Sequence, residues 1–318
     1  MEKNSKIYVA GGDTLIGQAL LRELERHGYA NVLGPEPDPT DAAQVDAFFK
    51  ERAPEYVFLV AGRSGGICAN QKYPADLMMD NLLVETGVVG AAHRHGVKKL
   101  LYLASSCSYP REAAQPMRVE ALMTGRLEPT NEAYAVAKLA GVTLCQAFRQ
   151  QYGDDFVVGI PANYFGPGDD FSPEDSHVVG ALIRRMHEAK AAGRASVEIW
   201  GTGSPRREFV YADDLADACI FVMRNYNDGL PLNVGGGDDL SIRDLALLVK
   251  EVVGYEGELA FDAARPDGMP LKSLDSERLL GMGWRPRTSF REALRQTYRW
   301  FLENYEERSA PERAAHVR

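Results

Sequence analysis

Residues 6–20 read KIYVAGGDTLIGQAL, and this stretch carries the pattern from which the fold is inferred. A short run of apolar and β-forming residues ends in two glycines. Ile16 and Leu20 then follow at the four-residue spacing of one helix face. A strand that turns through glycines directly into a helix is typical of the first unit of a parallel α/β sheet.

The same alternation of strand and helix continues along the next 140 or so residues. The connections between these elements are of ordinary length. Continuous apolar strands such as YVFLVAG at 56–62 are expected to be covered by helices on both faces. The fold class is therefore α/β, a doubly wound parallel sheet of the Rossmann type. The predicted strands are 31–33, 56–62, 98–106 and 156–163, and the predicted helices are 41–52, 78–96 and 131–152.

The pattern changes after Pro167, where a polar loop interrupts the alternation. We assign residues 1–166 to a first domain and residues 167–318 mainly to a smaller C-terminal α/β domain. Residues 208–235 read as strand and helix pieces that rejoin the first domain. The charged tail after Leu302 is expected to fray.

Composition excludes several classes of protein. The 318 residues are 45% hydrophobic and 25% charged with a net charge of −9, and no basic block stands out, which argues against a nucleic-acid partner. No signal peptide and no apolar stretch of membrane-spanning length is seen. The four cysteines form no C-x-x-C pair, so we expect no metal site and a cytoplasmic location.

The Gly-rich turn is the expected place for the pyrophosphate of a dinucleotide. Gly11 and Gly17 let the backbone approach the phosphates, and the following helix presents its N–H groups there. Thr14 stands where a middle glycine is usual, so its side chain would narrow the approach. The alternative is a tight strand-to-helix connection without a ligand. Residues 1–166 are accordingly predicted to bind the dinucleotide.

Acidic residues near the end of the second strand favour NAD(H). A carboxylate there accepts hydrogen bonds from the ribose hydroxyls, whereas an arginine would accept a 2′-phosphate. Glu36 and Asp38 lie in this window and Asp13 lies in the turn, with no Arg or Lys nearby. Asp41 is a candidate for adenine contacts. The alternative is that these acids only face solvent.

Three residues form a candidate catalytic group. Tyr134 and Lys138 are four apart on a predicted helix and so share one face. A neighbouring ammonium favours the phenolate and brings the tyrosine into the working range of an acid or base. Ser105, at the end of the preceding strand, can polarise a carbonyl. A Y-x-x-x-K pair alone can also be an ordinary surface pair, but its position after the serine strand favours hydride chemistry on a carbonyl.

Several longer strings resemble the GDP-L-fucose synthases, which are extended short-chain dehydrogenases of the NAD-dependent epimerase/dehydratase group. They are LASSCSYP at 103–110, GRLEPTNEAYAVAKLAG at 125–141, PANYFGPGDDFSPEDSHV at 161–178, WGTGSPRREFVYADDLADA at 200–218 and RPDGMPLKSLD at 265–275. The resemblance implies a GDP-sugar substrate. It also implies epimerisation at carbons 3 and 5 of GDP-4-keto-6-deoxy-D-mannose, followed by reduction of carbon 4 with NADPH.

The resemblance implies that Ser105, Tyr134 and Lys138 carry the reduction and that Cys107 and His177 carry the epimerisation. Since Cys107 follows Ser105 by two residues, we expect both side chains on the same face of the strand. Without the resemblance, Cys107 would read as buried packing and His177 as a loop histidine.

The remaining predicted residues fall into two sets. The implied substrate-binding residues of the GDP-sugar are Arg185, Trp200, Arg207, Asp267 and Lys272, of which Arg185, Arg207 and Lys272 would meet the diphosphate. The predicted cofactor-binding residues are Gly11, Asp13, Thr14, Leu15, Ile16, Gly17, Glu36, Asp41, Ala61, Gly62, Tyr134, Lys138, Pro161, Asn163, Tyr164 and His177.

The chain departs from the family pattern at the N-terminus. Asp13 stands where the family has the arginine that holds the 2′-phosphate of NADP, and Glu36 lies where basic residues follow the second strand. A 2′-phosphate would meet like charge there. We therefore expect the NADPH preference to be weakened or reversed.

Two other functions remain open. One is a related GDP-sugar epimerase or reductase that uses retained NAD and makes a different deoxyhexose. The other is a dinucleotide sensor without catalysis, which would have no need of Ser105, Tyr134 and Lys138. By analogy with extended enzymes of this type, a homodimer is expected in which the helix of Tyr134 and the helix before the serine strand pack together. The candidate contacts are Leu139, Val142 and Leu144, which are equally compatible with burial on the sheet.

Overall fold

The computed structural model describes residues 1–173, 176–265 and 267–305. Most of the tail that was expected to fray lies outside these residues. The centre of the protein is a parallel sheet with the strand order β1-β2-β3-β4-β8. Its strands are β1 (Ile7–Ala10), β2 (Tyr56–Leu59), β3 (Lys99–Leu103), β4 (Phe156–Pro161) and β8 (Leu232–Val234). The predicted α/β fold with a parallel sheet is confirmed.

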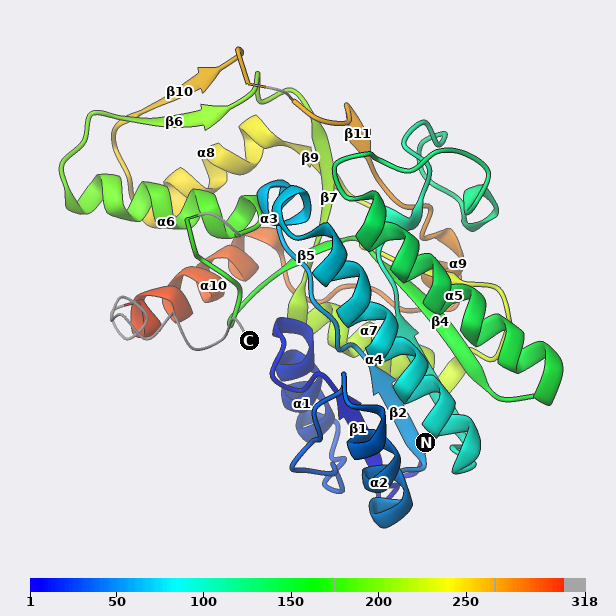
Figure 1. Ribbon diagram of the computed structural model, residues 1–318. Coiled ribbons are helices and arrows are strands. Elements are labelled where there is room, and N and C mark those ends of the chain that lie inside the picture. The colour runs from blue at the N-terminus through cyan, green and yellow to red at the C-terminus, as the bar shows by residue number, and fades with distance from the viewer. Residues whose placement is uncertain (174–175, 266, 306–318) are drawn as a thin grey trace.

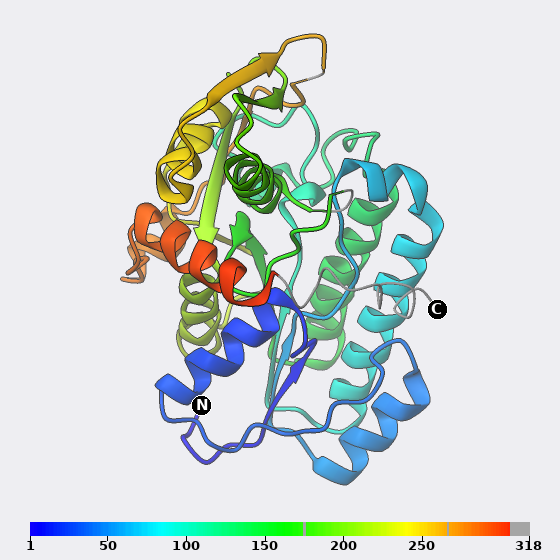
Figure 2. The ribbon, with the colours of Figure 1, turned by 90° about the vertical axis from the view of Figure 1, so that its left-hand side faces the viewer.

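Helices cover both faces of this sheet, as the apolar strands require. Helices α1 (Leu15–Arg26) and α7 (Ala212–Asn225) pack together on one face, and α2 (Ala42–Arg52), α4 (Pro74–Arg94) and α5 (Glu132–Tyr152) cover the other (Figure 1). Figure 2 shows the sheet between the two helical layers. The carboxyl ends of the strands therefore open at one edge, where a ligand crevice is expected.

The predicted strand at 31–33 is reduced to a single bridge. Val32 pairs in parallel with Ile7, and the backbone N–H of Leu33 donates to the Ile7 carbonyl at 2.8 Å. Pro35 follows two residues after Leu33 and has no N–H with which to extend the ladder. The chain thus leaves the sheet edge immediately before Glu36.

The C-terminal part builds smaller sheets beyond the end of the central one. Strands β5 (Asn163–Phe165), β7 (Arg206–Tyr211), β9 (Asp239–Ser241) and β11 (Leu271–Lys272) form one sheet, and β6 (Ser196–Trp200) pairs with β10 (Glu258–Asp262). Helices α6 (Val178–Ala191), α8 (Ile242–Val253) and α10 (Phe290–Asn304) pack beside them (Figure 1). The short elements are α3 (Ile67–Lys72), α9 (Glu277–Gly281) and the 3₁₀ turns η1 (Ser106–Ser108) and η2 (Val119–Ala121).

Two hydrophobic clusters hold these parts together. The first surrounds the central sheet and includes residues from α7 and β8, so the chain returns to the first core after leaving it. The second lies among α6, α8, α10 and β7, with Phe165, Met186 and Phe301 almost fully buried. The predicted division of the chain at residue 166 is compatible with this arrangement and stays a prediction. Among the described residues, no helix has an apolar stretch long enough to cross a membrane.

Candidate active site

The Gly-rich turn is built for a close backbone approach. Gly11 has a φ of +94°, and a Cβ on Gly17 would lie 1.8 Å from the Gly11 carbonyl oxygen, so neither position accepts a side chain. Thr14 begins α1 as its cap: its hydroxyl donates to the Gly11 carbonyl and accepts from the Gly17 N–H. The threonine side chain is therefore folded onto the turn. The turn and the first N–H groups of α1 fit the pyrophosphate of a dinucleotide.

Glu36 lies directly against this turn. Its carboxylate accepts the backbone N–H of Gly11 at 3.0 Å. Burial raises the pKa of Glu36, and the hydrogen bonds from Gly11 and Gly12 oppose that rise. The exposed side chain of Asp13 adds a second acid at the turn. Asp41, proposed for adenine, caps α2 by accepting the N–H groups of Ala43 and Gln44, so its adenine contact stays a prediction.

Ser105, Tyr134 and Lys138 come together at the end of β3. A hydrogen bond links the Ser105 and Tyr134 side chains, and the Lys138 ammonium lies 6.0 Å from the centre of the Tyr134 ring. Burial raises the pKa of Tyr134, and that hydrogen bond opposes the rise. Burial lowers the pKa of Lys138. The protein by itself therefore holds Tyr134 as a neutral phenol, the form that donates a proton, and not as the phenolate expected from the lysine alone.

The prediction that Cys107 and Ser105 share one face of a strand is wrong. Strand β3 ends at Leu103, and Cys107 lies in the 3₁₀ turn η1, whose cap is Ser105. The Ser105 hydroxyl accepts the Cys107 N–H at 3.2 Å, so the alternation of a strand no longer applies. The turn nevertheless keeps Cys107 close enough to Tyr134 for the two groups to interact electrostatically.

Two polar side chains surround the Cys107 sulfur. The Asn131 amide donates to Sγ at 3.2 Å, and the Lys272 ammonium lies 3.5 Å from Sγ. Lys272, implied to bind the diphosphate, is thus placed at the thiol. Both groups are hydrogen-bond donors directed at the sulfur. Asn131 was not among the predicted residues.

His177 ends the loop before α6, where its imidazole lies within electrostatic range of Lys272. The side chain of His177 is partly open to solvent, and the protein atoms packed around the ring exclude the rest of its water. This burial lowers the pKa of His177, Lys272 lowers it further, and Asp170 opposes both. Lys272 is therefore electrostatically coupled to both Cys107 and His177. The neutral imidazole that results can accept a proton near pH 7.

The implied GDP-binding residues form a cationic and aromatic group on the C-terminal part. The guanidinium groups of Arg185 and Arg265 lie 5.4 and 4.9 Å from rings of Trp200, which is 49% exposed. Arg265 was not predicted from the sequence. Arg207 and Lys272 are partners on neighbouring strands β7 and β11. Asp267 accepts two hydrogen bonds from Thr202, which ties the loop after β6 to the loop before β11.

The other predicted cofactor residues line the carboxyl ends of the strands. Ala61 and Gly62 follow β2, and Pro161 ends β4. Asn163 and Tyr164 lie on β5, which pairs with β7. Gly62 has a φ of +137°, and a Cβ there would lie 3.1 Å from the Lys138 ammonium. The turn after β2 and the Lys138 side chain are therefore in direct contact.

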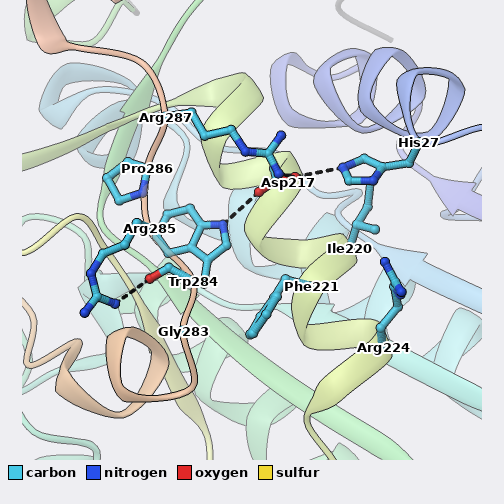
Figure 3. A pocket seen from close by; sticks show the side chains of 10 residues that line it. All are labelled: His27, Asp217, Ile220, Phe221, Arg224, Gly283, Trp284, Arg285, Pro286 and Arg287. Carbon is cyan, nitrogen blue, oxygen red and sulfur yellow. Dashed lines mark hydrogen bonds and ion pairs between the residues drawn. The ribbon is translucent and has the colours of Figure 1, made fainter.

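A cavity of about 400 Å³ lies away from these residues, between α7 and the segment 283–287 (Figure 3). Its wall includes His27, at the end of α1 opposite to the Gly-rich turn. Asp217 accepts hydrogen bonds from His27 and Trp284 and pairs with Arg287. The Asp217 carboxylate therefore links the segment 283–287 to α7.

One group with metal-ligand spacing is found in residues 1–173, 176–265 and 267–305, namely Glu23, His27 and Asp217. Glu23 is already paired with Arg26, and Asp217 with Arg287 and His27. These cations and N–H donors take the place that a metal ion would need. The cluster is a structural network.

Comparisons with known proteins agree with this geometry. The model of the NAD dependent epimerase/dehydratase family matches residues 7–235. GDP-L-fucose synthase 1 of Arabidopsis thaliana is 51% identical over 306 residues, which covers 95% of this chain and 95% of that protein. A GDP-6-OMe-4-keto-L-xylo-heptose reductase from C. jejuni is 33% identical with a TM-score of 0.90 and covers 96% and 99% of the two chains.

A GDP-L-fucose synthetase from Naegleria fowleri, solved with bound NADP, is 27% identical with a TM-score of 0.88 and covers 96% of each chain. Together these matches extend over nearly the whole chain and include both the Gly-rich turn and the C-terminal sheets. The chain belongs to the NAD-dependent epimerase/dehydratase family and, within it, to the GDP-L-fucose synthases.

Proposed function

We propose that this protein converts GDP-4-keto-6-deoxy-D-mannose to GDP-L-fucose by epimerisation at carbons 3 and 5 and reduction at carbon 4. The observation that carries the proposal is the presence of Cys107 beside the Ser105–Tyr134 pair. A dehydrogenase that only moved a hydride would not need a thiol held by an amide and an ammonium. The membership of the chain in the family supports the same activity.

Epimerisation requires removal and return of a proton next to the ketone. One of Cys107 and His177 takes the proton from carbon, and the electron pair moves to the carbonyl oxygen as an enolate. Ser105 and Tyr134 donate hydrogen bonds to that oxygen and stabilise its charge. The other residue returns a proton to the opposite face of the carbon, which inverts its configuration.

Reduction uses the same oxygen contacts. The dinucleotide, when bound, supplies the hydride that reaches carbon 4. Ser105 orients the carbonyl oxygen and Tyr134 gives its phenolic proton to it. Lys138 stabilises the negative charge that remains on Tyr134. Arg185, Arg207 and Trp200 are proposed to hold the GDP part, so that binding energy remote from the ketone positions it for both steps.

For the cofactor we propose a preference for NADH. Glu36 is held at the turn by the Gly11 N–H, where its carboxylate is placed to accept hydrogen bonds from the ribose hydroxyls as well. A 2′-phosphate at this place would face the carboxylates of Glu36 and Asp13. Like charges brought together cost several kcal/mol, and about 1.4 kcal/mol corresponds to tenfold in affinity.

Incubation of the protein with GDP-4-keto-6-deoxy-D-mannose and either NADH or NADPH tests both proposals. We expect GDP-L-fucose with one cofactor oxidised per sugar, and a kcat/KM with NADH roughly a hundredfold above that with NADPH, for the charge reason given above. The variant Glu36→Gln should lose most of this ratio, whereas Asp46→Asn on α2 should keep it. A large preference for NADPH would contradict only the cofactor proposal. Absence of GDP-L-fucose among the products would contradict the proposed epimerase and reductase activity.

The second candidate is reduction of another GDP-linked keto sugar without the fucose product. It is supported by the fold and 33% identity shared with the C. jejuni GDP-keto-heptose reductase. In the same incubation this candidate predicts slow oxidation of the cofactor and a product that differs from GDP-L-fucose at carbon 3 or 5.

We further propose a homodimer formed by α4 and α5, which pack against each other. Met79 and Leu83 on α4 and Val136 on α5 are more than a third exposed, which leaves an apolar face on this pair of helices. A second copy of the same face would bury it. Val142, one of the candidate contacts, is instead packed into the core of its own subunit with 3% exposure.

Sedimentation of the full chain checks the dimer. The wild type is expected to sediment as a dimer and Leu83→Glu as a monomer, because the charge would be buried in the interface. Leu247→Glu, at an exposed leucine of α8, is the matched control and should remain dimeric. A monomeric wild type would contradict the proposal.

A further inference from the structure

A buried carboxylate lies behind the catalytic lysine. Glu85 on α4 has 0% exposure, and its Oε1 is 3.4 Å from the Lys138 ammonium. The Tyr102 hydroxyl donates to the same oxygen at 2.6 Å. Lys138 itself is 5% exposed. The pair is thus a desolvated ion pair directly beneath the active site.

Two glycines make room for this pair. A Cβ on Gly141 would lie 2.8 Å from the Glu85 carboxyl carbon and 2.6 Å from the Tyr102 hydroxyl. A Cβ on Gly62 would lie 3.1 Å from the Lys138 ammonium. The backbone of the turn after β2 and the backbone of α5 therefore both lie close to the side chains of Glu85 and Lys138. Such an arrangement fixes the position of the ammonium under Tyr134.

The interaction of Glu85 with Lys138 affects the protonation of both groups. Burial disfavours the charged form of both groups: it raises the pKa of Glu85 and lowers the pKa of Lys138, and each charge opposes the effect of burial on the other. An ammonium buried without a counter-charge would lose its proton near neutral pH. Reduction needs the charged lysine, because only the ammonium stabilises the charge left on Tyr134.

We propose that Glu85 is a positioning residue for the reduction, whose carboxylate keeps Lys138 charged and fixed beneath Tyr134. The inference rests on the proposed reductase function and deepens it. It extends the Ser105, Tyr134 and Lys138 group by one residue that touches neither substrate nor cofactor. The titratable groups that face this pair are Tyr102 from β3, and Tyr134 and Cys145 from α5.

The variant Glu85→Gln removes the charge and keeps an oxygen that accepts from Tyr102. Without the counter-charge Lys138 loses its proton at a lower pH, so the alkaline limb of the pH profile of kcat for reduction moves down. The expected shift is roughly 1 to 3 pH units, the usual effect of one close opposite charge. KM for the GDP-sugar should change little, since Glu85 does not reach the binding residues.

Asp217→Asn is the matched control. Asp217 is also a buried carboxylate with several donors, but it lies at the cavity opposite to the Gly-rich turn. Its replacement is expected to lower the melting temperature and to leave the alkaline limb of the profile unchanged. An unshifted limb in Glu85→Gln would overturn the proposal, because a purely structural role predicts the same profile at reduced stability.

A second pair of variants tests the mechanism without relying on turnover. Lys138→Met leaves Glu85 buried and unpaired, so adding Glu85→Gln to it should raise the melting temperature. A lower melting temperature of the double variant would show that the two residues do not act as a pair. The melting temperatures also distinguish failure of this inference from failure of the proposed function. If the wild type reduces no GDP-keto sugar, the proposed function is wrong, and the melting temperatures still measure the coupling between Glu85 and Lys138.

Discussion

Replacing Tyr134 by phenylalanine is expected to lower the rate of ketone reduction by about 10²- to 10⁴-fold, the range supplied by a positioned general acid. Tyr134 is held by Ser105 and sits over the Lys138 ammonium, and the variant keeps the ring but removes the proton. The GDP-sugar should still bind with nearly unchanged affinity, because Arg185, Trp200 and Arg207 are untouched. Single-turnover oxidation of the bound nicotinamide and titration calorimetry with GDP-sugar measure the two quantities.

Tyr152→Phe is the control for this variant. Tyr152 lies on the same helix, is 55% exposed and packs against His93 and Phe148. It should retain the wild-type rate. Rapid reduction by Tyr134→Phe would mean that another group donates the proton, and the role assigned to Tyr134 would have to be withdrawn.

Replacing Cys107 by serine is expected to slow exchange of the protons beside the ketone by roughly 10²- to 10⁴-fold while hydride transfer remains possible. A hydroxyl is a much weaker acid than a thiol, so serine exchanges a proton with carbon far less readily, although the donors Asn131 and Lys272 remain in place. In deuterated water, nuclear magnetic resonance should show little deuterium at carbons 3 and 5. The reduced product should accumulate with unchanged or partly inverted configuration.

The matched control is Cys219→Ala. Cys219 is buried in α7, an element other than the turn that carries Cys107, and its loss removes one sulfur without changing any residue proposed to transfer a proton. Deuterium incorporation at both carbons should match the wild type. If Cys107→Ser formed GDP-L-fucose at the wild-type rate, the acid–base role of this residue would be wrong.

Much of the candidate site can be predicted from residues whose spacing in the sequence is compatible with one local structure. Tyr134 and Lys138 must share a helix face, and Gly11 and Gly17 must sit where backbone segments meet. The long strings around Cys107 and His177 identify the family on resemblance alone. The comparisons bear out that family, whereas the individual residue roles stay predictions.

Other features could not be predicted because they depend on chain segments that are far apart in sequence. Whether Cys107 lies on a strand or in a turn depends on where the ladder of β3 ends, and no local pattern marks that point. Glu85 offered one signal: it and Asn81 are four apart on an otherwise apolar face of α4. A buried charge of this kind requires a partner, but its partner is 53 positions away at Lys138, as the residue numbers show.

The sequence by itself thus determined the parallel α/β fold and the family, because the fold follows from the alternation of strands and helices and the family from long strings of residues. Only the tertiary structure decided how the groups of the candidate site are charged. Glu36 lies against the Gly-rich turn because the chain leaves the sheet edge at Pro35, and Lys138 meets Glu85 because α4 and α5 pack together. Protonation depends on burial and on charges within a few ångströms, and these are set by packing.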